Sequence, residues 1–122
     1  PMAVFIDPEI AMVGETAAQA SASGHAVVEV YLDLAAVAKA HVVGAPVGGL
    51  LLWADRDGGR ILGGQILAPR AADLIHEVAL AVRACLTAAD LADMVHVYPT
   101  VSDGWRLAAR QMLRDYPELL GK

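Results

Sequence analysis

The sequence predicts an α+β fold, in which an antiparallel β-sheet of about four to five strands is covered on one face by helices. Two observations support this prediction. Two apolar runs, residues 49–54 and 60–67, are joined by a segment ending in Asp57-Gly58-Gly59, and such a tip is typical of a β-hairpin. After residue 70, apolar residues recur at helical spacing, and two further helix starts follow.

Short apolar runs bounded by turn residues define the strands. The run 26–32 is rich in β-branched residues, which pack well on a pleated surface. Asp7-Pro8 closes the first run and Gly14 closes the second, as expected for turns. Strands are therefore expected at 3–6, 11–13, 26–32, 49–54 and 60–67. Residues 34–41 are ambiguous between a helical turn and an extended link.

Four helices are expected, and most carry a recognisable start or stop. The first covers residues 15–23 and ends at Gly24, which suits the position after a last helical turn. The second covers 71–86, with a broad apolar stripe that includes Cys85 and predicts a packed core thiol. Thr87 begins a short third helix through residue 94, with Asp90 completing a capping box. Thr100 and Asp103 repeat that pattern before the last helix.

Length and composition indicate one domain, residues 1–122, with a large apolar surface. The chain has 122 residues, of which 57% are hydrophobic, and a mean hydropathy of +0.48. A membrane-spanning helix needs about 20 mostly apolar residues. The longest uncharged stretch, residues 40–54, is shorter and is broken by His41, Pro46 and glycines. We therefore expect the excess apolar surface to form an oligomer interface rather than a membrane span.

Charge and cysteine content exclude several classes of partner. The net charge of −5 and the absence of a basic run argue against nucleic acid. A single cysteine excludes an internal disulfide and suits a reducing compartment, so we expect a cytoplasmic protein. No signal peptide is visible, and the start at Pro1-Met2, directly before a strand, suggests a piece of a longer protein.

The motifs of a self-contained enzyme are missing from the sequence. There is no glycine-rich dinucleotide fingerprint before a helix, no P-loop, no cysteine pair, no G-x-S-x-G and no His-x-x-x-His. A complete redox, nucleotide-binding or hydrolytic site is therefore not expected within this chain.

The histidines differ in their surroundings. We interpret His25 as a solvated loop residue, His41 as a packing residue, and His76 with Glu77 as a surface pair. His96 is different because Tyr98, Thr100 and Asp103 follow within a few residues. Even there a structural interpretation is slightly favoured by the pattern alone, with Thr100 and Asp103 capping the last helix and Tyr98 filling a core gap.

Three segments in register resemble the C-terminal dimerisation domain of the pyridine nucleotide-disulfide oxidoreductases. They are FIDPEIAMVG at 5–14, RILGGQILAP at 60–69 and LTAADLADMVHVYPTVSDGWRLAA at 86–109. The family includes glutathione reductase, dihydrolipoamide dehydrogenase and mercuric reductase. The resemblance implies a homodimeric flavoprotein, with FAD and NAD(P)H held by other domains of the parent chain. It also implies that the last loop enters the partner subunit's active site.

The same resemblance implies roles for individual residues. Disulfide-reducing members carry a His directly before Pro-Thr as acid/base, with an acid beyond it that orients it. Here that position is Tyr98, Asp103 stands where the family usually has Glu, and His96 lies two residues early. In an extended segment, that offset would keep His96 on the same face as Tyr98.

A Tyr at this position resembles the mercuric reductase branch, where a Tyr in the corresponding loop contacts the mercuric ion. Soluble transhydrogenase-like members also carry Tyr there, so Tyr98 does not settle the substrate. The tail at 113–122 lacks the cysteine pair of mercuric reductases. The turn at residues 68–73 reads Ala-Pro-Arg-Ala-Ala-Asp, where relatives tend to have Ala-Gly-Glu.

Two hypotheses follow. The first is an interface domain that binds its twin and lends Tyr98, Asp103 and His96 to a composite site, where Tyr98 contacts the mercuric ion. The second is a free-standing small-molecule or metal-handling module in which the same three residues form a local site, although three such groups specify a metal poorly.

Overall fold

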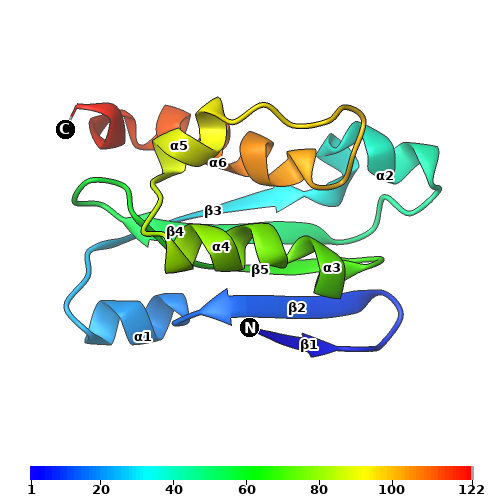
Figure 1. The fold of residues 1–122 in the computed structure, drawn as a ribbon, viewed down its shortest axis with the longest axis horizontal. Coiled ribbons are helices and arrows are strands. Elements are labelled where there is room, and N and C mark those ends of the chain that lie inside the picture. Colours follow the sequence, from blue (N-terminus) through cyan, green and yellow to red (C-terminus); the bar gives the residue numbers. More distant parts are fainter. Residues whose placement is uncertain (122) are drawn as a thin grey trace.

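The computed structural model describes residues 1–121, and its strands form one five-stranded sheet in the order β1-β2-β5-β4-β3. Every neighbouring pair is antiparallel. The strands are β1 (Met2–Val4), β2 (Glu9–Gly14), β3 (Val27–Asp33), β4 (Gly49–Asp55) and β5 (Ile61–Ala68). The predicted α+β fold class is confirmed, and the five strands lie within a residue or two of the expected runs (Figure 1).

The helices are α1 (Ala17–Ala22), α2 (Ala38–Val42), α3 (Ala71–Leu74), α4 (His76–Arg83), α5 (Ala88–Asp93) and α6 (Asp103–Asp115), with 3-10 turns η1 (Leu34–Ala36) and η2 (Pro117–Leu120). On one face of the sheet, α4 packs on β5, and α6 packs on β3 and β4. On the opposite face α1 places Ala20 against Trp53 and Leu62. The ambiguous residues 34–41 thus form a 3-10 turn and a short helix.

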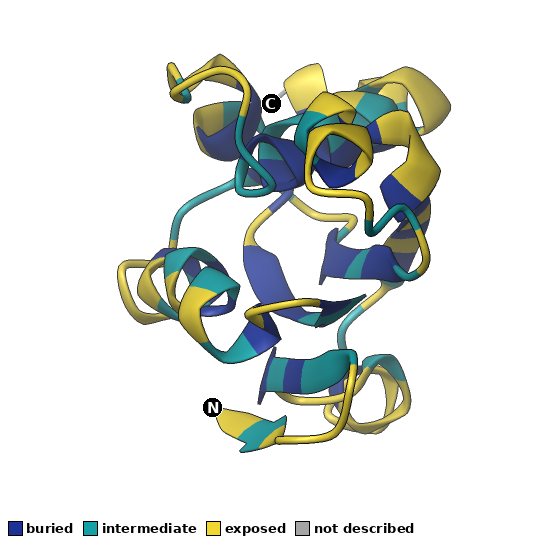
Figure 2. Cartoon of the chain, turned by 90° about the vertical axis from the view of Figure 1, so that its right-hand side faces the viewer, coloured by how far each residue is buried: buried dark blue, intermediate teal, exposed yellow. Residues whose placement is uncertain are grey.

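The main core lies between the sheet and the helices α3 to α6. Strand β3 alternates strictly between buried and less buried residues, as expected when one face of a sheet packs on helices. Leu52 and Ile66 from the sheet meet Val78 of α4 and Trp105 of α6, and all are fully buried. Figure 2 shows the buried strands at the centre, with exposed residues on the outer helix surfaces.

The hairpin between β4 and β5 forms as predicted from its sequence. Gly58 and Gly59 both have positive φ, of 85° and 75°, which glycine adopts without strain. Farther along β5, a Cβ on Gly63 would lie 2.7 Å from the ring of Trp53 and 2.6 Å from the Val13 carbonyl. Glycine at this position therefore lets the large indole lie flat on the sheet, where its Nε1 donates to the Glu15 carbonyl at 2.8 Å.

The single helix expected over residues 71–86 is wrong in two places. It divides at Ile75, where the Leu74 carbonyl accepts a hydrogen bond from the indole Nε1 of Trp105 at 3.0 Å. It also ends at Arg83, because the backbone of Leu86 pairs with Ile61 of β5 at 2.8 Å. Both changes depend on tertiary contacts, and the spacing of apolar residues along the sequence does not reveal such contacts.

Cys85 is not the packed core thiol that the sequence predicted. It lies in the turn after α4, with a left-handed φ of 56°, and its side chain is exposed. The turn bends the chain so that Thr87 can bridge to Arg60 and cap α5. The capping box between Thr87 and Asp90 is confirmed, and the Thr87 backbone hydrogen bond, followed by its side-chain bond, lowers the pKa of Asp90.

Two smaller features complete the fold. The C-terminal turn η2 is tied to the β4–β5 hairpin by an ion pair between Arg56 and Glu118 and by the stacking of Arg56 over Tyr116 at 5.1 Å. Within residues 1–121, no helix combines the length and the apolar character that crossing a membrane requires.

Candidate functional site

The segment between α5 and α6, residues 94–102, is the part of the chain in which the sequence placed its candidate chemistry. It arches over the top of the molecule in Figure 1, from the end of α5 toward α2, before it enters α6. The segment has no regular secondary structure. Its conformation must therefore be fixed by side chains, and His96 supplies the central contact.

His96 turns its ring into the protein, although its neighbours in the loop face outward. Only 4% of its side chain is exposed, and its Nε2 lies 2.6 Å from Oε1 of Glu77 on α4. Its Nδ1 lies 3.2 Å from the Met94 carbonyl oxygen. The expectation that Glu77 forms a surface pair with His76 is wrong: Glu77 faces the loop, and His76 is exposed.

The chemistry of the two neighbours constrains the protons on His96. A carbonyl oxygen only accepts, so Nδ1 must carry a proton toward Met94. Nε2 then either accepts a proton from neutral Glu77 or donates one to its carboxylate. In both cases one proton is shared between His96 and Glu77.

The surroundings of Glu77 change the pKa of its carboxyl group. The side chain of Glu77 is 20% exposed. Burial raises the pKa of Glu77; the His96 hydrogen bond and charge act against that rise, and the nearby Asp103 carboxylate adds to it. The net pKa is raised, so Glu77 resists ionisation more than an exposed glutamate does.

Asp103 lies at the first position of α6 and has its own partner. Its carboxylate accepts from Arg106, at 2.6 Å from Nε and 3.1 Å from Nη2. This hydrogen bond is the main reason that the pKa of Arg106 is raised. Thr100 ties the loop to the helix, because its hydroxyl donates to the Val97 carbonyl at 2.7 Å and accepts from the Asp103 amide at 3.2 Å. The expected hydrogen bond between Thr100 and Asp103 is present, but the prediction of Thr100 as N-cap is wrong, because α6 begins at Asp103 and its N-cap is Ser102, whose side chain makes no capping bond.

Tyr98 stands apart from His96 and Asp103. Its side chain is 70% exposed, so it does not fill a core gap. Its hydroxyl has no hydrogen bond in the part of the chain that the structure describes. The expectation that His96 and Tyr98 share a face is also wrong. The loop is not paired in a sheet, so the period of two that a strand imposes is not kept.

The exposed residues of the loop are mainly apolar. Val95 and Val97 are among the most exposed large apolar residues of the chain, and Met94 is exposed beside them. Together with Tyr98 they form an apolar edge of four residues, Met94, Val95, Val97 and Tyr98, which we call the loop edge. A contiguous apolar surface of this kind is typical of a contact with another protein surface.

The remaining histidines are held locally. His25 was expected to be solvated, but its Nδ1 lies 2.5 Å from the Asp55 carboxylate and its side chain is half-buried. Burial raises the pKa of Asp55, but the His25 and Asp57 hydrogen bonds outweigh that rise, so the net pKa is lowered. His41 is exposed rather than packed, although its Nε2 donates to the Ala35 carbonyl at 2.7 Å.

The side chains that the sequence singled out do not form a metal centre. Among residues 1–121 there is no group of three or more His, Cys, Asp or Glu side chains placed to hold a metal ion. Of the three predicted site residues, His96 and Asp103 are buried in separate pairs, and Tyr98 alone faces outward. Sequence reasoning missed Glu77 as the partner of His96, because 19 residues separate the two.

Comparison with known proteins identifies the family of this chain. Residues 1–109 match the family model described as "Pyridine nucleotide-disulphide oxidoreductase, dimerisation domain". This chain belongs to that family. The family resemblance drawn from the sequence is thereby confirmed.

Two relatives illustrate the range of the family. The domain is 43% identical over 103 residues to a dihydrolipoyl dehydrogenase of Mycobacterium tuberculosis, covering 84% of this chain and 22% of the relative. It is 37% identical over 119 residues to a mercuric reductase of Acidithiobacillus ferrooxidans, covering 98% of this chain and 22% of the relative. The dimerisation domain thus spans about a fifth of the length of these curated relatives.

Solved structures share the fold. LpdA from Mycobacterium tuberculosis superimposes with a TM-score of 0.85 at 33% identity, over 91% of this chain and 24% of that chain. The HOCl-induced flavoprotein disulfide reductase RclA from Escherichia coli gives a TM-score of 0.84 at 28% identity, over 89% of this chain and 25% of that chain. The dimerisation domain therefore corresponds to about a quarter of each of these solved chains.

Proposed function

We propose that this dimerisation domain joins two copies of an FAD-dependent oxidoreductase and inserts its 94–102 loop into the partner subunit's active site. The loop edge is the observation that carries the proposal, because four apolar or aromatic residues are exposed with no cover from the domain itself. Obligate dimer interfaces resemble a core cut in half and bury about 2,000 Å² or more. The loop edge would form part of such an interface.

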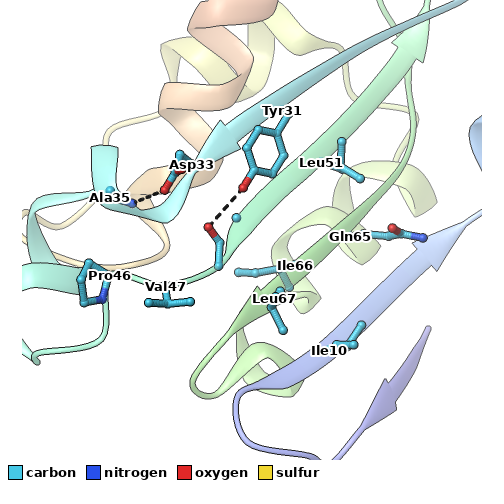
Figure 3. Close-up of a pocket in the computed structure, with 12 residues that line it drawn as sticks. Ile10, Tyr31, Asp33, Ala35, Pro46, Val47, Leu51, Gln65, Ile66 and Leu67 are labelled. Atoms are coloured by element: carbon cyan, nitrogen blue, oxygen red, sulfur yellow. Dashed lines mark hydrogen bonds between the residues drawn. The ribbon is translucent and has the colours of Figure 1, made fainter.

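Other surfaces of the domain would contact the flavin- and nicotinamide-binding domains of the parent chain. The face of the sheet opposite α3 to α6 carries a hollow of about 690 Å³, lined by apolar residues such as Ile10, Leu51 and Leu67, with Tyr31 at one side (Figure 3). FAD and NAD(P)H would be bound by those other domains and would supply the redox chemistry. The dimerisation domain contributes side chains and a matching surface to the partner's site. We assign the cytoplasm as the compartment of the protein.

Tyr98 sets the chemistry that the loop would bring to the partner's site. The position directly before Pro99-Thr100 holds a phenol rather than an imidazole, and the loop's one imidazole, His96, is buried against Glu77, so this position offers no ready acid/base for a thiol near neutral pH. The phenol oxygen can instead hold a substrate by donating or accepting a hydrogen bond. We assign mercuric reductase-like chemistry to the parent, with the mercuric ion as substrate contacted by Tyr98. The match to a mercuric reductase over 98% of the chain supports this assignment.

Dimerisation through the loop edge is tested by Val97→Asp. A carboxylate at this exposed position leaves the monomer folded but must be desolvated in an interface. We expect the dissociation constant of the dimer to rise tenfold or more in analytical ultracentrifugation. Both variants are measured in the 122-residue chain, where Val47→Asp is the matched control because Val47 is similarly exposed but lies at the hollow on the open sheet face. A wild-type chain that stays monomeric at high concentration contradicts the proposal.

The role of Tyr98 is tested by Tyr98→Phe in the full-length parent. The phenylalanine keeps the apolar surface and removes only the hydroxyl, so dimerisation should be unchanged. We expect the turnover of mercuric ion to fall by about tenfold or more, since a positioned polar group is lost from the reacting centre. Unchanged turnover would show that Tyr98 acts only as interface surface.

A further inference from the structure

A cavity of about 460 Å³ lies beneath the 94–102 loop. It is bounded by α2 and the turn after it, by the turn between β5 and α3, and by residues Pro99 to Ser102 of the loop. The apolar side chains of Val43, Leu74 and Val101, each at least partly exposed, line it. Its volume falls in the range of small-molecule sites, which are mostly apolar with a few polar groups that orient the ligand.

The charged groups that line this cavity are both cations. Lys39 of α2 and Arg70 of the β5–α3 turn contribute to its wall, and no Asp or Glu does. The chain as a whole carries a net charge of −5, whereas both charged residues that line this cavity are positive. We call it the Lys39–Arg70 pocket. A cavity with this lining attracts anions.

Both cations are available to a ligand. Lys39 is half-buried and forms no ion pair in the described part of the chain. Arg70 pairs with Asp73 at 3.1 Å, but both side chains are largely exposed, and such pairs contribute little. The Arg70 backbone is held in the left-handed region, with φ of 62°, a conformation that residues other than glycine seldom adopt.

Ser102 adds a neutral donor to the same wall. Its side chain lines the cavity and makes no hydrogen bond within residues 1–121, and it does not cap α6. An ammonium, a guanidinium and a hydroxyl are all able to donate to a carboxylate, and charge-assisted bonds of this type are the stronger ones. The aliphatic wall excludes a fully hydrated ion and suits a hydrocarbon chain.

We propose that the Lys39–Arg70 pocket binds a small aliphatic carboxylate, with the carboxylate between Lys39 and Arg70 and the hydrocarbon chain against Val43, Leu74 and Val101. This site is formed by one copy of the chain alone, so the proposal goes beyond dimerisation and does not rest on it. Because the loop forms one wall, an occupied pocket would also brace the segment that carries Tyr98.

The test is a titration of the isotope-labelled 122-residue chain with sodium octanoate, followed by NMR. We expect saturable shifts at Val43 and Val101 with a dissociation constant on the order of 1 mM, which is reasonable for about ten heavy atoms. Two probes separate the contributions: 1-octanol keeps the tail without the charge, and acetate keeps the charge without the tail. Each should bind at least tenfold more weakly than octanoate.

Variants locate the site. Lys39→Gln and Arg70→Gln should each weaken octanoate binding about fivefold, and the double variant should abolish saturation. Arg83→Gln is the matched control, because Arg83 is an exposed cation outside the cavity. Amide spectra that match the wild type show that the variants are folded.

Three outcomes would overturn the proposal. The first is absence of saturation at 10 mM octanoate, about ten times the expected constant. The second is octanol binding as tightly as octanoate, which would make the cavity a nonspecific apolar surface. The third is shifts at Val43 and Val101 that follow protein dilution rather than octanoate, which would show that a second copy of the chain covers the pocket.

Discussion

Replacing Trp105 by alanine is expected to lower the free energy of unfolding by about 4 kcal/mol, within the usual range of 3–5 kcal/mol for a buried tryptophan. Trp105 is 0% exposed and lies where α6 meets the sheet, with its ring edge near Gly64 of β5. The substitution leaves a cavity at the centre of the main core. It also removes the hydrogen bond from Nε1 to the Leu74 carbonyl, at the break between α3 and α4.

Urea denaturation followed by circular dichroism and by the fluorescence of Trp53 measures this effect. Trp105→Phe keeps a buried aromatic ring but loses the indole N–H and part of the ring volume, so a smaller loss of about 1–2 kcal/mol is expected. Tyr98→Ala is the control, since it truncates an exposed aromatic side chain, and its change should stay within about 0.5 kcal/mol. A loss below about 1 kcal/mol for Trp105→Ala would mean that α6 does not anchor the core.

Replacing Glu77 by alanine is expected to loosen the 94–102 loop and to cost about 1–3 kcal/mol, the range for a buried polar group that loses its partner. The group left behind is the imidazole of His96, whose side chain is 4% exposed and whose Nε2 lies 2.6 Å from Glu77. Hydrogen exchange of the loop amides should rise in Glu77→Ala relative to the wild type. Exchange in the sheet should rise by no more than the global loss of stability, so the largest relative increase should be in the loop.

Glu77→Gln tests the charge separately from the hydrogen bond. A glutamine amide can donate to or accept from the imidazole, so the loop should keep its protection from exchange. Unchanged loop exchange in Glu77→Ala would show that the pair does not position the loop. Faster exchange in Glu77→Gln as well would show that the loop requires the carboxyl group itself.

The pH dependence of stability gives a further measurement on the same variant. Because burial raises the pKa of Glu77, the folded state binds this proton more tightly than the unfolded state does. The resulting stabilisation is complete below the ordinary value of 4.5 and is lost as the pH rises through the pKa of the folded chain. The stability of the wild type relative to Glu77→Gln should therefore decrease as the pH rises above about 4.5. An increase over the same window would contradict the direction of the shift.

Much of the fold could be predicted because its signals are local. The hairpin tip at Gly58-Gly59 and the capping box at Thr87 depend on residues close in sequence, and both are confirmed. The prediction for Cys85 was wrong because the end of α4 is set by pairing of Leu86 with Ile61, and periodicity within a helix contains no information about that pairing.

The candidate site could be predicted in its location but not in its geometry. The sequence pointed to the loop around Tyr98, and the structure leaves Tyr98 exposed there. It did not predict that His96 turns inward to Glu77 or that Asp103 is bound by Arg106. Whether Tyr98, His96 and Asp103 act in a partner's site stays a prediction.

By itself the sequence determined the family, the positions of the five strands, and the segment that carries Tyr98. Local turn chemistry and residue patterns encode these features directly. Only the tertiary structure decided which side chains of that segment are buried and which remain exposed. His96 and Glu77 meet because α4 and the loop lie on the same face of the sheet. Within this unpaired loop, burial depends on which partner the fold places nearby, and spacing along the chain cannot specify that partner.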